Sequence, residues 1–428
     1  MRAAIVLALL FGLAAPAGAA QPSRDPVATA KALMLGGRTA EARALLLELA
    51  ASGAARHDVN FLLGLLAIDA REYGQAIQRF RSILVDEPGA VRVRLELGRA
   101  FYLKHDYENA FRQFQFARAG KPAPGVVASI DRFIAAIRRE KRWSYSLSLA
   151  IAPDSNINNG SSTSEVELFG LPFELGEETR SKSGVGVAME GAVEFAPRIA
   201  DNVRLRLGAA VQRRDYAGSR YDDMTIALHA GPRIVAGRWD LSAEASAFQR
   251  RLGGERLSEG TGVALGATRH LDARTAIAAG LSAYLTRYPD YPLQDGPSLS
   301  ASLGAFRALT PASSASVRIG VGIKSARADE FAYRWQSVGL GYQRELAGGF
   351  SVQAEPSLAL SRYEADDAFF GKRRKDRLIE LRLAVLNRRI DLSGFTPRVG
   401  FTWSRRRSSI DLYDSNQRRF EFGVTRAF

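Results

Sequence analysis

The chain contains no cysteine and only four histidines among its 428 residues. Without cysteine the protein has no disulfide, no thiolate metal site, no thiol nucleophile and no lipidated N-terminal cysteine. Four histidines are too few to predict a histidine-rich metal centre. No set of residues suggests a catalytic site, so we expect that the protein binds no metal or cofactor and is not an enzyme. Long apolar runs are also missing. After the first twenty residues nothing approaches the roughly 18 apolar residues of a membrane-spanning helix.

Acidic residues are outnumbered, with 45 Asp+Glu against 59 Lys+Arg and a formal charge of +14. Such a charge favours anionic surfaces in general and does not by itself identify nucleic acid as the partner. The length suits about two or three domains, so a single compact core is not expected.

The first twenty residues are typical of an export signal. Arg2 gives a basic start, an apolar run covers 5–15, Pro16 ends it, and small residues follow. This pattern predicts cleavage after Ala19 or Ala20. A membrane anchor is the alternative reading, but the apolar run is short for one. Export also argues against a nucleic-acid partner.

Residues 21–141 are predicted to form an α-solenoid of tetratricopeptide repeats. Similar residues recur 34 positions apart, which is the tetratricopeptide period. The recurring pairs are Gly64 and Gly98, Tyr73 and Tyr107, Ala76 and Ala110, Phe80 and Phe114, and Pro88 and Pro122. A weaker copy covers about 23–56. An apolar stripe at helical spacing predicts a closing cap helix, and it comprises Val127, Ile130, Ile134 and Ile137. The aromatic residues are expected to pack between helices, whereas a bound peptide would lie on the concave face.

From Trp143 onward the apolar period changes from 3.6 to 2. Tyr145, Leu147 and Leu149 alternate with serines and alanine, as in a strand with two different faces. About fourteen such segments follow, each near the roughly 9–11 residues that cross a bilayer as a tilted strand. They begin near residues 143, 183, 203, 223, 238, 260, 275, 298, 314, 334, 350, 377, 396 and 418. Residues 142–428 are therefore predicted to form an antiparallel transmembrane β-barrel, and the whole chain an α plus β multidomain protein.

Short and long connections alternate along this region. The long polar stretches are 153–181, 215–222, 252–259, 287–297, 325–333, 363–376 and 405–417. Outer-membrane barrels alternate periplasmic turns and extracellular loops in this way, whereas a soluble β-sandwich, the alternative, has no reason to. An even number of strands places both barrel ends on the side of the short turns. The helical repeats are therefore expected in the periplasm, with the barrel in the outer membrane of a Gram-negative cell.

An export signal, a few tetratricopeptide repeats and a barrel of about fourteen strands together resemble the Slam family, the surface lipoprotein assembly modulators. The segment from Pro153 to Asn158 also resembles the family's Pro-x-x-Asn-Ile-Asn element. The resemblance implies an outer-membrane translocation factor that delivers a surface lipoprotein or secreted protein client from the periplasm to the cell surface. The alternative is a polysaccharide-export porin with periplasmic repeats, although such porins usually carry far more repeats and should line their lumen with one sign of charge.

Three groups of side chains are candidate contacts. Asp154, Asn156 and Asn158 would contact the client or a loop at the barrel mouth, or else form an Asx-rich turn. The candidate lumen charges are Arg204, Arg206, Arg214, Arg318, Glu190 and Glu194. The candidate lipopolysaccharide contacts are Lys372, Arg373, Arg374, Arg405, Arg406 and Arg407. The last strand, with its terminal Phe428, resembles the signal that the barrel-insertion machinery recognises.

Overall fold

The computed structural model describes residues 25–168, 171–390, 392 and 395–427. The expected export signal and Phe428 lie outside the described residues. The chain divides into two compact units, of which one ends at Arg79 and the other begins at Phe80. The domain boundaries expected after residues 20 and 141 remain predictions.

Seven α-helices precede the first strand in the part of the chain that the structure describes. They are α1 (Pro26–Leu35), α2 (Thr39–Ser52), α3 (Arg56–Asp69), α4 (Tyr73–Asp86), α5 (Val91–Leu103), α6 (Tyr107–Ala119) and α7 (Pro124–Glu140). Helices α4 and α6 begin 34 residues apart, at Tyr73 and Tyr107. None of these helices is long and apolar enough to cross a membrane. The helices agree with the predicted repeat.

The small and aromatic residues of the repeat form its core. The buried members are Ala76, Phe80, Ala110 and Phe114. A Cβ atom on Gly98 would lie 3.0 Å from Cε1 of Phe114, so glycine allows the ring to pack directly on α5. Phe114 also stacks on Phe133 of α7, with 4.9 Å between the ring centroids, and Ile130 and Ile137 are buried. Helix α7 therefore covers α6, as the cap prediction requires.

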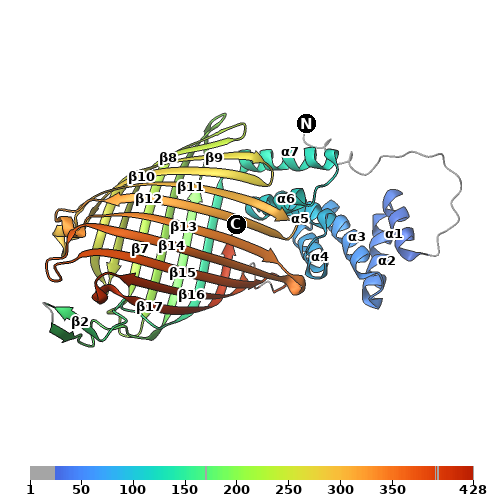
Figure 1. The fold of residues 1–428 in the computed structure, drawn as a ribbon. Coiled ribbons are helices and arrows are strands. Elements are labelled where there is room, and N and C mark those ends of the chain that lie inside the picture. The colour runs from blue at the N-terminus through green and yellow to red at the C-terminus, as the bar shows by residue number, and fades with distance from the viewer. Residues whose placement is uncertain (1–24, 169–170, 391, 393–394, 428) are drawn as a thin grey trace. The chain divides into compact units, whose positions relative to one another are not determined.

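Fourteen antiparallel strands form a closed ring (Figure 1). They are β1 (Trp143–Asp154), β4 (Gly184–Phe195), β6 (Val203–Tyr216), β7 (Asp223–Ala236), β8 (Trp239–Leu252), β9 (Glu255–Asp272), β10 (Thr275–Arg287), β11 (Gly296–Thr310), β12 (Ser313–Lys324), β13 (Tyr333–Glu345), β14 (Phe350–Asp366), β15 (Arg373–Asn387), β16 (Thr396–Ser408) and β17 (Ser415–Ala427). Strand β1 pairs with β4 on one side and with β17 on the other, which closes the ring. The predicted barrel of about fourteen strands is confirmed.

Three short strands lie outside this ring. Strand β5 (Arg198–Ala200) pairs with the start of β6. Strands β2 (Glu165–Leu168) and β3 (Leu171–Glu174) form a separate hairpin within the long connection between β1 and β4.

The two faces of the barrel wall differ in composition. In β1, Leu149 and Ile151 are 48% and 57% exposed, whereas Ala150 and Ala152 between them are buried. Each of the fourteen strands carries at least one large exposed apolar residue of this kind. An apolar outer face around a closed ring is what a lipid-embedded barrel requires, because the ring leaves no unpaired strand edge in the membrane.

Three of the expected long loops are shorter than predicted. The loop expected at 252–259 is a two-residue turn, because Gly253 and Gly254 have φ angles of 61° and 86° and β9 already begins at Glu255. The loop expected at 363–376 is reduced to 367–372 by the ends of β14 and β15. Likewise, β16 runs to Ser408, so the stretch 405–407 lies in a strand and not in a loop. These predictions were wrong because strand pairing continues beyond the apolar band, where the side chains are polar.

Candidate functional site

Helices α6 and α7 contact the barrel at the end where its short turns lie (Figure 1). Arg138 of α7 donates hydrogen bonds to the carbonyl oxygens of Gly237 and Trp239 in the β7–β8 turn, at 3.1 and 3.3 Å. The ring of Phe111 in α6 lies 6.5 Å from the ring of His270 near the end of β9. These contacts attach the helices to one wall of the barrel.

The same group of helices also contacts strands further round the ring. Phe116 and Ala119 of α6 form a buried cluster with Ala308 at the end of β11. Arg94 of α5 forms an ion pair of 2.6 Å with Glu345 at the end of β13. Strands β8 and β13 have four strands between them, so these contacts span more than a third of the ring. Helices α5–α7 therefore extend across this opening of the barrel.

Arg94 joins two helices to the barrel. It is fully buried, and its guanidinium donates to the carbonyl oxygen of Pro88 at 3.0 Å and to Oε1 of Gln113 in α6 at 2.8 Å. The same group lies 5.0 Å from the centroid of the Phe116 ring. One buried guanidinium therefore holds α5, α6 and the β13–β14 turn, and its loss would leave the buried Glu345 without its shortest ion pair.

Sequence reasoning missed Arg94 and Glu345, although the repeat carried a signal. Thirty-four residues before Arg94 and Gln113 stand Asn60 and Arg79, and Arg79 donates to Oδ1 of Asn60 at 3.0 Å. The two repeats thus hold an equivalent hydrogen bond with donor and acceptor exchanged. A polar pair at a core position of the repeat could have been found from the period.

The first of the predicted lumen charges, Arg204, fixes the joint between α7 and β1. It is 5% exposed and donates to the carbonyl oxygens of Lys141 and Ala196, the latter at 3.3 Å. The backbone N–H of Ala196 in turn donates to the carbonyl oxygen of Arg142 at 2.6 Å. Arg204 therefore stabilises the chain where it enters the barrel.

Other predicted lumen charges form a network on the inner face. Arg206 donates to Glu194 at 2.9 Å through Nε and also pairs with Glu244, while His229 lies 3.4 Å from Glu194. Strand alternation places Glu190, Arg214 and Arg318 on the same inner face. The inner wall therefore carries charges of both signs.

Asp154, Asn156 and Asn158 anchor the long connection after β1. Asp154 and Asn156 are buried, and Asp154 accepts hydrogen bonds from Nε2 of Gln417 at 2.8 and 3.0 Å. Asn156 exchanges two hydrogen bonds with the backbone of Gly160. Asn158 donates to the carbonyl oxygen of Arg180 at 2.7 Å. The structure thus gives these side chains the bonds of an Asx-rich turn, and client contact stays a prediction for them.

The two basic runs are divided between the faces of the wall. Arg374 pairs with Asp376 at 2.7 Å and lies 3.5 Å above the ring of Tyr413. By strand alternation Arg374 and Arg406 lie on the inner face. The outer side of this end carries Arg373, Arg405 and Arg407, and Lys372 stands in the adjacent loop. Lipopolysaccharide contact stays a prediction for all six residues.

No group of three or more acidic or histidine side chains in the described ranges is placed to hold a metal ion. The arrangement provides hydrogen-bond donors, acceptors and charges along a lumen and across its opening. It is suited to holding a flexible chain.

A closed ring of antiparallel strands with an apolar outer face and a charged inner face defines a transmembrane β-barrel of the outer-membrane type. Residues 143–428 match the family model described as "Surface lipoprotein assembly modifier". The chain therefore belongs to the surface lipoprotein assembly modifier family, as the sequence resemblance implied.

Curated relatives are similar over most of the chain. Surface lipoprotein assembly modifier 1 of Haemophilus influenzae is 22% identical over 379 residues, which cover 85% of this chain and 76% of that protein. Hemophilin secretion modulator of Acinetobacter baumannii is 24% identical over 386 residues, covering 84% and 77%. Surface lipoprotein assembly modifier 1 of Neisseria meningitidis serogroup B is 21% identical over 381 residues, covering 85% and 74%.

Among solved structures, "Bacterial polysaccharide outer membrane secretin" overlaps 66% of this chain and 98% of its own, with 15% identity and a TM-score of 0.37. An overlap this weak indicates neither a common fold nor a common function.

Proposed function

We propose that the chain delivers a surface lipoprotein or secreted protein client from the periplasm to the cell surface. Membership of the surface lipoprotein assembly modifier family supports this proposal, and so do the names of relatives that modify lipoprotein assembly or modulate secretion of hemophilin. The single structural observation that carries it is the placement of α5–α7 across one opening of the barrel. A client held by these helices is already at the lumen or beside the wall.

The helices are assigned to the periplasm because the short turns they contact belong on that side of an outer-membrane barrel. In this proposal the repeats capture an unfolded client, the client moves through or along the barrel, and folding outside the cell prevents its return. No nucleotide is available in the periplasm, so folding supplies the direction. The chain acts as an assembly factor and not as an enzyme.

Two further partners follow from the barrel itself. Basic residues on the outer side of the loop end, among them Arg405 and Arg407, are assigned to the phosphates of lipopolysaccharide. The alternating aromatic residues of β17, Phe420 and Phe422, are assigned to recognition by the barrel-insertion machinery during biogenesis.

The test is deletion of this chain from the native cell, followed by protease treatment of intact cells and detection of the candidate client. A small secreted or lipidated β-rich protein encoded beside this chain is the first client to examine. We expect the total amount of client to persist while its protease-accessible fraction falls, and re-expression to restore it. A second surface protein with its own export route serves as the control. Equal exposure of the client with and without this chain would contradict the proposal.

A further inference from the structure

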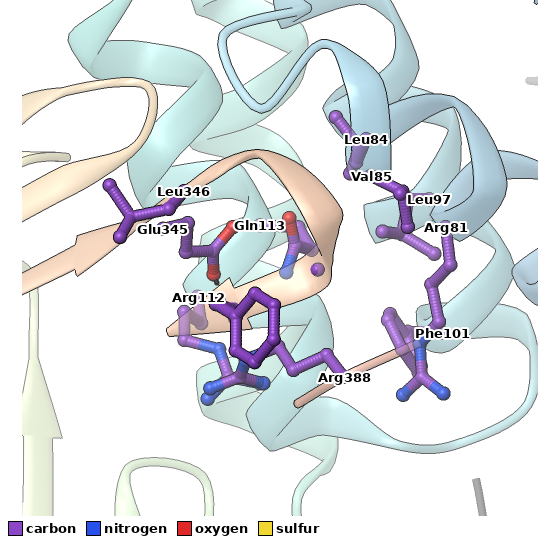
Figure 2. Close-up of a pocket in the computed structure, with 12 residues that line it drawn as sticks. Arg81, Leu84, Val85, Leu97, Phe101, Arg112, Gln113, Glu345, Leu346 and Arg388 are labelled. Carbon is purple, nitrogen blue, oxygen red and sulfur yellow. Dashed lines mark ion pairs between the residues drawn. The ribbon is translucent and has the colours of Figure 1, made fainter. Parts of the chain in front are cut away.

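A pocket with more cations than carboxylates lies where α5 and α6 meet the β13–β14 turn (Figure 2). Its volume is about 40 Å³, which exceeds the roughly 10–15 Å³ that one water molecule needs. The charged lining residues are Arg81, Arg112, Arg388 and Glu345. Apolar side chains, including Phe101 and Phe350, form the remaining wall. The pocket has room for a group of a few heavy atoms.

The single carboxylate in the lining is engaged through one oxygen only, because Oε1 of Glu345 is buried and has no hydrogen-bond partner among the described residues. Oε2 of Glu345 is paired with Arg94 at 2.6 Å, outside the pocket lining. Oε1 of Glu345 lies 3.9 Å from Nε of Arg388, which is beyond hydrogen-bond distance. Glu345 therefore does not satisfy the guanidinium groups that face the pocket.

Two of these guanidinium groups keep unused donors. The Nε–H groups of Arg112 and Arg388 are buried and have no hydrogen-bond partner among the described residues. Leaving such donors unsatisfied is unfavourable, because they have lost their hydration without gaining an acceptor. Arg388 keeps 21% of its side-chain surface exposed, so the pocket can be reached from solvent.

The local electrostatics also favour a negative ligand. Burial, together with repulsion from Arg112, lowers the pKa of Arg388 to about 9. Burial likewise lowers the pKa of Arg112. In Figure 2, Arg112, Arg388 and Glu345 lie on one side of the pocket, and Arg81 lies on the other beside Phe101. An anion between Arg112 and Arg388 would offset both the burial and the repulsion.

We propose that Arg112 and Arg388 bind a carboxylate group in this pocket. The planar fork of a guanidinium matches a carboxylate with two parallel hydrogen bonds, and both side chains line the same pocket. The carboxylate belongs either to a polypeptide side chain or to a free small acid, and its chemistry is the same in both cases. This site does not depend on surface delivery of a client, because binding is measured on the purified chain alone.

The test uses the full mature chain in detergent micelles, titrated with sodium acetate against sodium chloride at equal ionic strength. Binding is followed by calorimetric titration and by the thermal midpoint. We expect saturable binding of acetate, weakened about tenfold or more in Arg388→Gln and in Arg112→Gln, each of which removes one guanidinium. Arg389→Gln removes the same charge from the exposed neighbouring residue and should leave acetate affinity unchanged.

Glu345→Gln removes the competing carboxylate and should strengthen acetate binding. Arg388→Lys keeps the charge without the fork and should weaken binding, which separates recognition from simple charge should the glutamine variant fail to fold. A blocked tripeptide with a central Glu is titrated in parallel with acetate. Tighter binding of the peptide would show that the carboxylate belongs to a polypeptide. Tighter binding of acetate would show that it belongs to a free small acid. No difference between acetate and chloride in the wild-type chain, or equal weakening by Arg389→Gln, would overturn the proposal.

Discussion

At the scale of single residues, Arg94 is the side chain on which the helix–barrel contact depends most. Replacing it by methionine leaves Glu345 buried without its closest partner, so we expect the contact to weaken by about 3–5 kcal/mol. Hydrogen exchange of α5 and α6 in detergent micelles measures this directly, and faster exchange is expected there with no change in the barrel strands. The double variant Arg94→Met, Glu345→Met removes both charges and should recover most of the protection.

Arg99 offers a control for that measurement on the same helix. Its ion pair with Glu96 is 3.4 Å long and partly exposed, so Arg99→Met should cost less than about 1 kcal/mol. Unchanged exchange of α5 in Arg94→Met would show that the junction is held by its apolar contacts alone.

At the opposite end of the barrel, where the long loops lie, Asn156 is a buried polar residue on which a local structure depends. Asn156→Ala removes both side-chain bonds to Gly160 and leaves buried backbone groups unsatisfied, which costs about 1–3 kcal/mol locally. We expect protease to cut the connection 155–183 faster, while the barrel stays folded as judged by its mobility in unheated electrophoresis. Ser162→Ala, at an exposed side chain of the same connection, should not change the cutting rate.

The candidate site was only partly predictable from sequence at this scale. The Asx-rich turn of Asp154 and Asn156 was foreseen as one of two readings, because such side chains bond their own backbone. The ion pair of Arg94 with Glu345 was not foreseen, because its partners are 251 residues apart. The repeat period marks the polar position of Arg94 but does not identify Glu345 as its partner. A contact between a repeat and a turn follows from how the two fit together, which local patterns do not encode.

At the scale of elements, the β8–β9 hairpin depends on two consecutive glycines. The backbone of Gly253 is left-handed, a conformation that residues with a side chain rarely adopt, and a Cβ atom there would lie 2.8 Å from the carbonyl oxygen of Arg220. We expect Gly253→Ala to cost about 1–2 kcal/mol and to lower the temperature at which the barrel unfolds in detergent. Gly176→Ala, where a Cβ meets nothing within 4 Å, is the control. Equal effects of the two substitutions would mean that the turn is not strained.

The strands themselves were well predicted, and their ends were not. Side chains that face lipid alternate with side chains that face the lumen wherever a strand crosses the membrane. This pattern predicted all fourteen strands, and most of them begin within a few residues of the predicted position. Beyond the membrane the pairing persists without an apolar face. The stretch 405–407 therefore belongs to β16 although its side chains are basic, and β9 starts at Glu255 instead of near 260.

At the scale of the whole molecule, the position of α5–α7 across the barrel opening predicts that α6 must move if a client passes through that opening. The chain has no native cysteine, so Ala119→Cys with Ala308→Cys introduces a single pair of thiols at a buried contact between α6 and β11. If the client passes this opening, oxidation of the pair should reduce its protease-accessible fraction severalfold, and reductant should restore it. The single-cysteine variants should deliver normally under both conditions.

Full delivery by the completely crosslinked chain would mean that α6 stays in place during export. The client would then move along the outside of the barrel or between α7 and the wall. The experiment therefore distinguishes a route through this opening from a route outside it.

The pairing of β1 with β17 sets an order of assembly. Because β1 pairs with β17, the ring cannot close until the segment that begins at Ser415 has been synthesised. The helices are synthesised long before that moment and have time to fold. The ring can therefore close only after α5–α7, which contact one of its openings, have been synthesised.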